Sequence, residues 1–332
     1  MLIVRESKTV LRTAPVNSAP PMASGGKKHR QWLRLKRNRT LLLMSLPAIL
    51  FFFVFCYIPM PGIYIAFVNY NYISGIFHST FIGMKNFEFF LQSGDLWRIT
   101  WNTIYYNLLF LVTSTIAQVA VAVMLNEIVN KPFKKVSQTL ILLPYFISWV
   151  LVGLFLYGFI NADEGVINVT LRHFGMHSID FYSQKAYWPF ILTFLNLWKG
   201  IGYGSIIYLS VITGIDSQII EAAMIDGASS WQRIRYITLP ALEGTVVILT
   251  LFAVGGILKG NFQMFYSTVG ANNTVLMPST DIIETYVFRC LSTNFNFSLG
   301  SAAGAYQSVL GFLIVMFANG VVKRIEPDYA LF

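Results

Sequence analysis

The chain has 332 residues, of which 55% are hydrophobic and only 12% are charged, with a formal net charge of +9. Soluble domains carry about 25% charged residues, so this composition excludes an ordinary water-soluble protein. Disorder is excluded as well, because 28 Phe, 17 Tyr and 7 Trp provide ample apolar area to bury. The two cysteines, Cys56 and Cys290, are too few for a disulfide framework and form no CxxC metal motif. We therefore expect an all-α integral membrane protein.

The first 40 residues form a basic tail that holds ten of the 24 Lys and Arg residues. A basic tail can bind nucleic acid, but this one has no folded scaffold and runs directly into an apolar segment. The positive-inside rule explains it better, since Lys and Arg hold a flanking segment in the cytoplasm. We expect residues 1–40 to be a partly disordered cytoplasmic tail with no nucleic-acid partner.

Six stretches are long and apolar enough to cross a bilayer, which takes about 20 residues. They are 41–67, 103–126, 136–160, 188–215, 241–258 and 302–322. With the N-terminus inside, cytoplasmic segments hold 17 of the 24 basic residues and extracytoplasmic loops hold six. The sequence therefore predicts a polytopic protein of six transmembrane helices with both ends cytoplasmic.

This topology divides the chain into segments. The first transmembrane helix, 41–67, is followed by an extracytoplasmic loop over 68–102. A five-helix core then spans 103–324, and 325–332 form a cytoplasmic C-terminal tail. Within the core, Pro144 is expected to kink the third span, because proline cannot donate a helical hydrogen bond.

Almost no ionisable residue lies inside the spans, although such residues usually mark ion pathways in a membrane. An ion-coupled secondary carrier would normally need a buried carboxylate, yet the first, second, third and sixth spans contain no Asp, Glu, Lys or Arg. The GxxxxGK[ST] phosphate loop and the HExxH motif are absent too. We expect neither a secondary carrier nor an enzyme that hydrolyses ATP by itself.

Lys199 is the exception, because it lies near the middle of the fourth span. Asn196, Lys199, Gly200 and Tyr203 follow an i, i+3, i+4, i+7 spacing and so share one helical face. Such a face could pack against another helix, with the glycine allowing close approach. We favour a substrate path, because packing rarely requires a midplane amine. Sugar hydroxyls could bind there, and an anionic sugar would be attracted to Lys199.

The cytoplasmic connection 216–240 carries the most specific pattern in the chain. Good helix formers extend to Asp226, Gly227 permits a break, and 229–236 is expected to form a second short helix. Pro240 suits the first turn of the fifth span. An exposed amphipathic helix–turn–helix of this kind could dock on another protein. The alternative is a helix lying on lipid, which would favour a more basic face.

This connection resembles the coupling loop of ATP-binding-cassette importer permeases at each of its fixed positions. The pattern is EAA, three residues, Gly, nine residues and I-x-L-P. In this chain it falls on Glu221, Ala222, Ala223, Asp226, Gly227, Ala228, Leu239 and Pro240. Segments 57–62, 83–87 and 198–202 are similar to the lipoprotein-associated, polysaccharide-type branch, which is related to the maltose-type permeases.

The resemblance implies a type I importer permease fold in a bacterial inner membrane and a role in importing an oligosaccharide or polysaccharide. Residues 221–227 would sit in a cleft of a cytoplasmic ATPase. The partners it implies are a different, second permease, two ATP-binding subunits that hold ATP and Mg, and an extracytoplasmic solute-binding protein. The chain itself would bind no cofactor.

The face that includes Asn196 lies where maltose-type permeases contact sugar. Lys199 is not the residue expected in that branch, so a different sugar is expected, and the charge of Lys199 would favour an acidic one. A secondary sugar carrier or a non-transporting membrane scaffold remains as the alternative. The scaffold would explain the spans and the docking loop but not the polar midplane face.

Overall fold

A computed structural model describes residues 38–270 and 272–325. The expected tails, 1–40 and 325–332, lie almost wholly outside the described residues. The chain divides after Pro61 into two units, each of which is described by itself. In the described part, the only β structure is an antiparallel pair, β1 (Val68–Asn69) and β2 (Thr80–Phe81), with Val68 opposite Phe81.

The described part of the first unit, residues 38–61, is an apolar helical segment. α2 (Arg39–Phe52) continues through a π-helical turn, Phe53–Tyr57, and none of its residues is buried. The helical run reaches Phe67 through a 3-10 segment that begins at Met60, so the first predicted span is present. Pro59 and Pro61 cannot donate helical hydrogen bonds, which accounts for the change of helix type around them.

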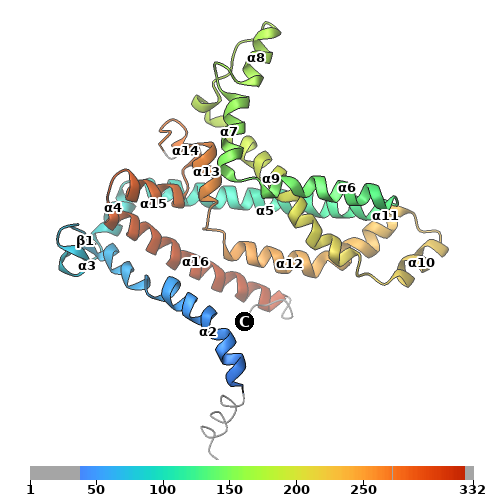
Figure 1. The fold of residues 1–332 in the computed structure, drawn as a ribbon, viewed down its shortest axis with the longest axis horizontal. Coiled ribbons are helices and arrows are strands. Elements are labelled where there is room, and N and C mark those ends of the chain that lie inside the picture. Colours follow the sequence, from blue (N-terminus) through green and yellow to red (C-terminus); the bar gives the residue numbers. More distant parts are fainter. Residues whose placement is uncertain (1–37, 271, 326–332) are drawn as a thin grey trace, which may run out of the picture. The chain divides into compact units, whose positions relative to one another are not determined.

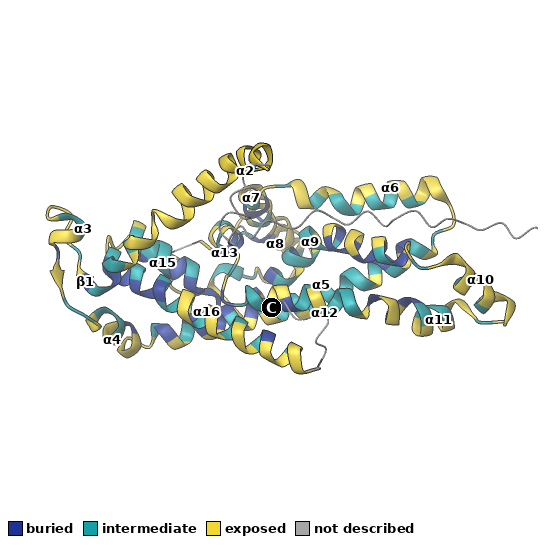
Figure 2. Ribbon diagram, turned by 90° about the horizontal axis from the view of Figure 1, so that it is seen from below, coloured by how far each residue is buried: buried dark blue, intermediate teal, exposed yellow. Residues whose placement is uncertain are grey.

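The second unit contains the rest of the helices. In chain order they are α3 (Gly75–His78), α4 (Lys85–Gln92), α5 (Asp95–Glu127), α6 (Lys131–Leu142), α7 (Trp149–Ile160), α8 (Val166–His173), α9 (Trp188–Ile212), α10 (Ser217–Ile225), α11 (Ser230–Arg233), α12 (Leu239–Gly255), α13 (Phe262–Thr268), α14 (Met277–Thr280), α15 (Ile283–Ser292) and α16 (Phe297–Ile325). α5 and α9 pack side by side, and α12 packs on both α9 and α16 (Figure 1). Buried residues gather where these helices face one another, whereas their outer faces are exposed (Figure 2).

Apolar clusters hold this arrangement together. Tyr208, Leu209 and Ile212 of α9 bury against Leu125 of α5 and Leu242 of α12. A second cluster, centred on Tyr106, Trp188 and Met264, joins α5, α9 and α13. Because α9 contributes to both clusters, its polar residues are held firmly between its neighbours.

The described residues contain five helices long and apolar enough to span a membrane, and a sixth span exists if one bent pair is counted. That pair is α6 and α7, so the third predicted span is not one helix. The two helices meet at 93°, through a 3-10 turn at Leu143–Phe146. Pro144 lies in this turn, and Ser148 caps the start of α7 by accepting a hydrogen bond from the Leu151 amide at 3.4 Å. The expected kink is therefore a complete break.

The sequence predicted a separate short helix at 229–236 in the 216–240 connection, and this prediction is wrong. α11, a π-helical turn at Ile234–Thr238 and α12 form one continuous helical run, Ser230–Gly255. Pro240 lies inside this run, where it cannot donate to the carbonyl four residues earlier. The wider π turn directly before it accommodates the missing donor.

Candidate functional site

The 216–240 connection is locally rigid. Asp216 caps α10 by accepting a hydrogen bond from the Gln218 amide at 3.0 Å. At the other end Gly227 adopts φ +80°, a left-handed conformation that glycine tolerates best. The Gly227 amide donates to the Met224 carbonyl at 3.1 Å, and the Ala228 amide donates to the Ala223 carbonyl at 2.9 Å. These bonds form a Schellman motif, which confirms the predicted helix end at Gly227.

The same connection is widely exposed (Figure 2). Glu221, Ala222, Asp226 and Gly227 are all exposed, and 86% of the Ile225 surface is open. Among the other residues singled out in the sequence, Leu239 and Pro240 are exposed, whereas Ala223 and Ala228 are half-buried. α10 carries no basic residue, so its surface suits a protein partner better than an anionic lipid surface.

A polar groove of about 610 Å³ lies between α5, α9 and α12, with the segment after α12 at one side. Most of its polar side chains are amides and hydroxyls, and one is an ammonium. The polar residues of the lining are Asn107, Ser114, Thr115, Gln118, Asn196, Tyr203, Tyr208, Lys259 and Asn261. Groups of this kind can exchange hydrogen bonds with sugar hydroxyls, and the tyrosine rings offer flat apolar surfaces.

Two of the four predicted path residues line this groove. The Asn196 side-chain amide donates to the Ser114 hydroxyl at 3.0 Å. Tyr203 lies nearly parallel to Tyr145, with ring centroids 4.5 Å apart. The backbone carbonyl of Gly200 accepts a bond from the Gln118 amide, although Gly200 itself is not part of the lining.

Lys199 does not line the groove. Its ammonium donates to the carbonyls of Tyr145 at 2.6 Å and Pro144 at 3.3 Å, and also to that of Ile147. The ammonium lies 5.4 Å from the centre of the Trp149 ring as well. Because the helix breaks at this point, the Tyr145 and Ile147 carbonyls have no backbone donor among the described residues, whereas the Pro144 carbonyl also accepts from the Ile147 amide at 3.2 Å. A membrane offers such carbonyls no water. Lys199 therefore satisfies the break between α6 and α7.

The sequence reasoning missed the residues of α5 that form the opposite wall. Asn107, Ser114 and Gln118 are spaced i, i+7, i+11 and so share one face of the helix. The spacing rule that identified the face of the fourth span would have found them. Lys259 was also missed, because the sequence placed it in an extracytoplasmic loop.

A second helix break borders the groove, between the end of α12 and the start of α13. The Asn107 amide donates to the Ile257 carbonyl at 2.8 Å and to the Lys259 carbonyl at 3.3 Å. The Gln307 amide donates to the Leu258 carbonyl at 2.5 Å. The irregular backbone is therefore satisfied by side chains of α5 and α16.

A carboxylate completes this break. Glu284 Oε1 accepts from the Gly260 amide and from the Gln307 side chain, both at 2.7 Å. Glu284 Oε2 is buried and has no hydrogen-bond partner among the described residues. Burial raises the pKa of Glu284, and the hydrogen bonds from Gln307 and Gly260 oppose that rise.

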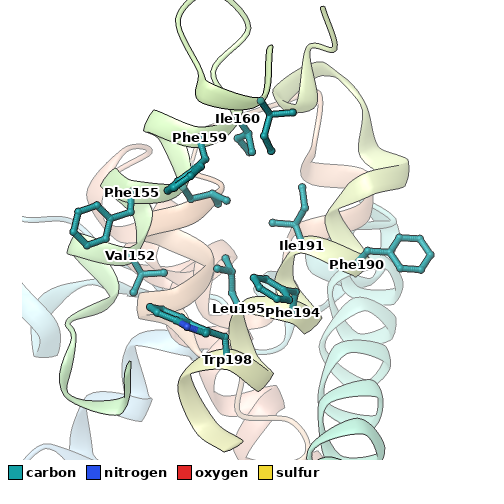
Figure 3. Close-up of a pocket in the computed structure, with 11 residues that line it drawn as sticks. Val152, Phe155, Phe159, Ile160, Phe190, Ile191, Phe194, Leu195 and Trp198 are labelled. Carbon is teal, nitrogen blue, oxygen red and sulfur yellow. The ribbon is translucent and has the colours of Figure 1, made fainter. Parts of the chain in front are cut away.

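A separate cleft of about 580 Å³ between α7 and α9 has a different character (Figure 3). Its lining is apolar and includes Phe155, Phe159, Phe190 and Phe194, with the indole of Trp198 at one end. Sugar hydroxyls would lose their hydrogen bonds in such a cleft. The polar groove is therefore the better candidate for a hydrophilic solute.

Known proteins resemble this chain over most of its length. The family model described as "Binding-protein-dependent transport system inner membrane component" matches residues 114–328. Protein LplB of Bacillus subtilis is 30% identical over 96% of this chain and 99% of its own length. The polygalacturonan/rhamnogalacturonan transport system permease protein YteP of the same species is 33% identical over 91% of this chain and 93% of its own.

A solved structure supports the same relationship. It is the crystal structure of a bacterial ABC transporter involved in the import of the acidic polysaccharide alginate, and a chain in it matches with a TM-score of 0.80 and 32% identity. The match covers 90% of this chain and 99% of the other. The predicted permease fold is thereby confirmed. The chain belongs to the family of inner membrane permease components of binding-protein-dependent transport systems.

Proposed function

We propose that this permease is a subunit of an ATP-driven importer of oligosaccharides or polysaccharides, in which loop 216–240 couples ATP hydrolysis to transport. The observation that carries the proposal is the rigid but exposed turn of α10 into Gly227. A surface that transmits force must keep its shape while remaining open to a partner. Asp216 and the Schellman motif fix the shape, and the exposed Glu221 and Ile225 leave the surface open.

The partner of this loop would be a cytoplasmic ATPase subunit. The residues that would contact it are Glu221, Ala222, Ala223, Asp226, Gly227, Ala228, Leu239 and Pro240. ATP and Mg would bind to two such ATPase subunits and not to this chain. A second permease and an extracytoplasmic solute-binding protein complete the importer, and the apolar outer faces would contact lipid.

The polar groove would form this chain's part of the sugar path. Asn196 and Tyr203 line it directly, while Gly200 and Lys199 hold the adjacent backbone and the α6–α7 break. The relatives support a saccharide substrate, since YteP is named for polygalacturonan and rhamnogalacturonan and the solved structure is of an alginate importer. Those substrates are acidic polysaccharides, so a uronate-containing oligosaccharide is the preferred substrate class.

The topology would place both chain ends in the cytoplasm. α10 then lies on the cytoplasmic side, where an ATPase can reach it. The segment after α12, which borders the groove, lies toward the extracytoplasmic side, where a binding protein delivers sugar. The distribution of basic residues along the chain supports this orientation.

The test is uptake by the complete transporter in proteoliposomes, with loaded binding protein outside and ATP inside. We expect sugar uptake to require ATP and to persist when proton and sodium gradients are collapsed. Uptake that follows an ion gradient without ATP would support the secondary-carrier alternative. No uptake of any saccharide, with normal assembly of the complex, would overturn the substrate class.

A further inference from the structure

Lys259 differs from every other residue that lines the groove. The lining contains amides, hydroxyls and apolar side chains, and among the described residues that form it only Lys259 carries a formal charge. Coulombic attraction in such a site extends further than a hydrogen bond between neutral groups. The groove therefore presents a single positive charge to whatever enters it.

The backbone of Lys259 is fixed while its side chain is free. The Lys259 amide donates to the Gly256 carbonyl at 2.7 Å, and its carbonyl accepts from the Asn107 amide at 3.3 Å. The Lys259 side chain is exposed, and its ammonium makes no hydrogen bond or ion pair with any described residue. This ammonium is therefore free to bind an incoming anion.

Glu284 is an acidic residue that interacts with Lys259, but it does not form an ion pair within 4.0 Å with the Lys259 ammonium among the described residues. The Gly260 amide and the Gln307 side chain already bind the Glu284 carboxylate.

Lys199 cannot take this role, although it was the cation that the sequence favoured for an acidic sugar. Three carbonyls of the α6–α7 break occupy its ammonium, which lies outside the groove lining. A ligand carboxylate would have to displace those carbonyls and leave two of them, Tyr145 and Ile147, without a donor among the described residues. An anion at the Lys259 ammonium would displace no hydrogen bond of that group among the described residues.

We propose that Lys259 is the specificity-determining residue of the groove and binds the carboxylate of a uronate unit. The neutral amides and hydroxyls of Asn107, Asn196 and Tyr203 would bind the hydroxyls of the same saccharide. This inference rests on the proposed function, because it assigns the acidic part of the substrate to one residue of the same groove. A primary ammonium on a carboxylate gives a charge-assisted hydrogen bond, stronger than a neutral one.

The test compares Lys259→Met and Lys259→Arg in the complete transporter, reconstituted in proteoliposomes. Lys185→Met is the matched control, since Lys185 is another exposed lysine expected on the extracytoplasmic side but is not part of the groove lining. The probes are a short oligogalacturonide and its methyl ester, which share the same sugar chain but differ in the carboxylate charge and in the added methyl groups. Uptake is measured with the binding protein saturated with either probe, so that the permease step limits the rate.

We expect Lys259→Met to slow uptake of the oligogalacturonide about tenfold and to leave uptake of the methyl ester unchanged. Lys259→Arg and Lys185→Met should resemble the wild type with both probes. Equal loss with the two probes in Lys259→Met would overturn the inference. So would a wild-type transporter that imports neutral saccharides but no uronide; in that case the proposed role as a saccharide importer would stand, and its preferred uronate substrate class would not.

Discussion

The ammonium of Lys199 donates a hydrogen bond to the backbone carbonyl of Tyr145 at 2.6 Å, joining the middle of α9 to the turn between α6 and α7. Tyr203, one turn further along α9, stacks on the Tyr145 ring. The same short segment is thus held both at its backbone and at its side chain. α9 also lines the polar groove, so the break and the groove share one helix.

Replacing Lys199 with Met should therefore destabilise the backbone between α6 and α7 without changing the selectivity for acidic over neutral saccharides. The Tyr145 and Ile147 carbonyls would lose their donor and the Pro144 carbonyl would keep only the Ile147 amide, at about 1.5–3 kcal/mol for a hydrogen bond to a charged group. We expect a lower thermal unfolding midpoint of the purified complex and equal loss of uptake for acidic and neutral saccharides. Lys199→Arg should retain part of both, and a selective loss of acidic substrates would contradict this role.

Gly227→Val should uncouple the transporter without preventing membrane insertion. At φ +80° a β-branched residue is strained by about 1–2 kcal/mol, so the Schellman motif would open. We expect the purified permease to retain less ATPase subunit. Gly227→Asn should retain more, because asparagine tolerates the left-handed region.

The matched control for that experiment is Gly175→Val. Gly175 ends α8 at φ +73°, and like Gly227 it has open space where a Cβ would lie. Its substitution imposes the same backbone strain in a segment expected on the other side of the membrane. If Gly175→Val released the ATPase subunit as fully as Gly227→Val, general misfolding would explain both.

Two glycines of α9 should respond in opposite ways to alanine. A Cβ at Gly202 would lie 2.2 Å from the Ile141 carbonyl oxygen, so Gly202→Ala must push α6 away from α9. We expect a loss of about 1–3 kcal/mol and poor assembly. At Gly200 nothing lies within 4 Å, so Gly200→Ala should assemble normally. Yield of intact complex in detergent distinguishes the two, and equal yields would refute this helix contact.

Glu284 should make stability depend on pH. Its raised pKa means that the folded state favours the protonated carboxyl, so its contribution is complete below the ordinary value of 4.5 and declines as the pH rises above it. Glu284→Gln removes the negative charge and keeps a side-chain oxygen that can accept the hydrogen bonds now made to Oε1. We expect its thermal midpoint to exceed that of the wild type at neutral pH and the difference to shrink toward pH 4.5.

The exposed Glu88 supplies the control for this pH series, as Glu88→Gln should follow the wild-type midpoint at each pH. A Glu284→Gln midpoint that falls below the wild type at neutral pH would show instead that the ionised carboxylate stabilises the break.

Local features of this molecule were predictable because local chemistry determines them. Residue hydropathy locates the spans, and the break at Gly227 follows from the need for a left-handed residue at a helix end. The 93° angle at Pro144 was not predictable, because a proline removes a donor without setting the direction of the next helix. Gly202 sets how closely α6 approaches, which is a tertiary contact.

The role of Lys199 illustrates the same limit. Its position in a span indicates that it needs a polar partner, but both a substrate and a free carbonyl meet that need. Only the position of Pro144 and Tyr145 beside α9 distinguishes the two. Lys259 was overlooked because a lysine just after a span is common, and nothing in its neighbouring residues indicates that this segment lines a groove.

The central claim is that loop 216–240 couples ATP hydrolysis to sugar movement through the groove. The most direct measurement records ATP hydrolysis and saccharide uptake together, in proteoliposomes that contain the complete transporter and its loaded binding protein. We predict that Gly227→Val abolishes uptake and removes the stimulation of hydrolysis by loaded binding protein, while Gly175→Val retains both. Normal stimulated hydrolysis with normal uptake in Gly227→Val would contradict the account.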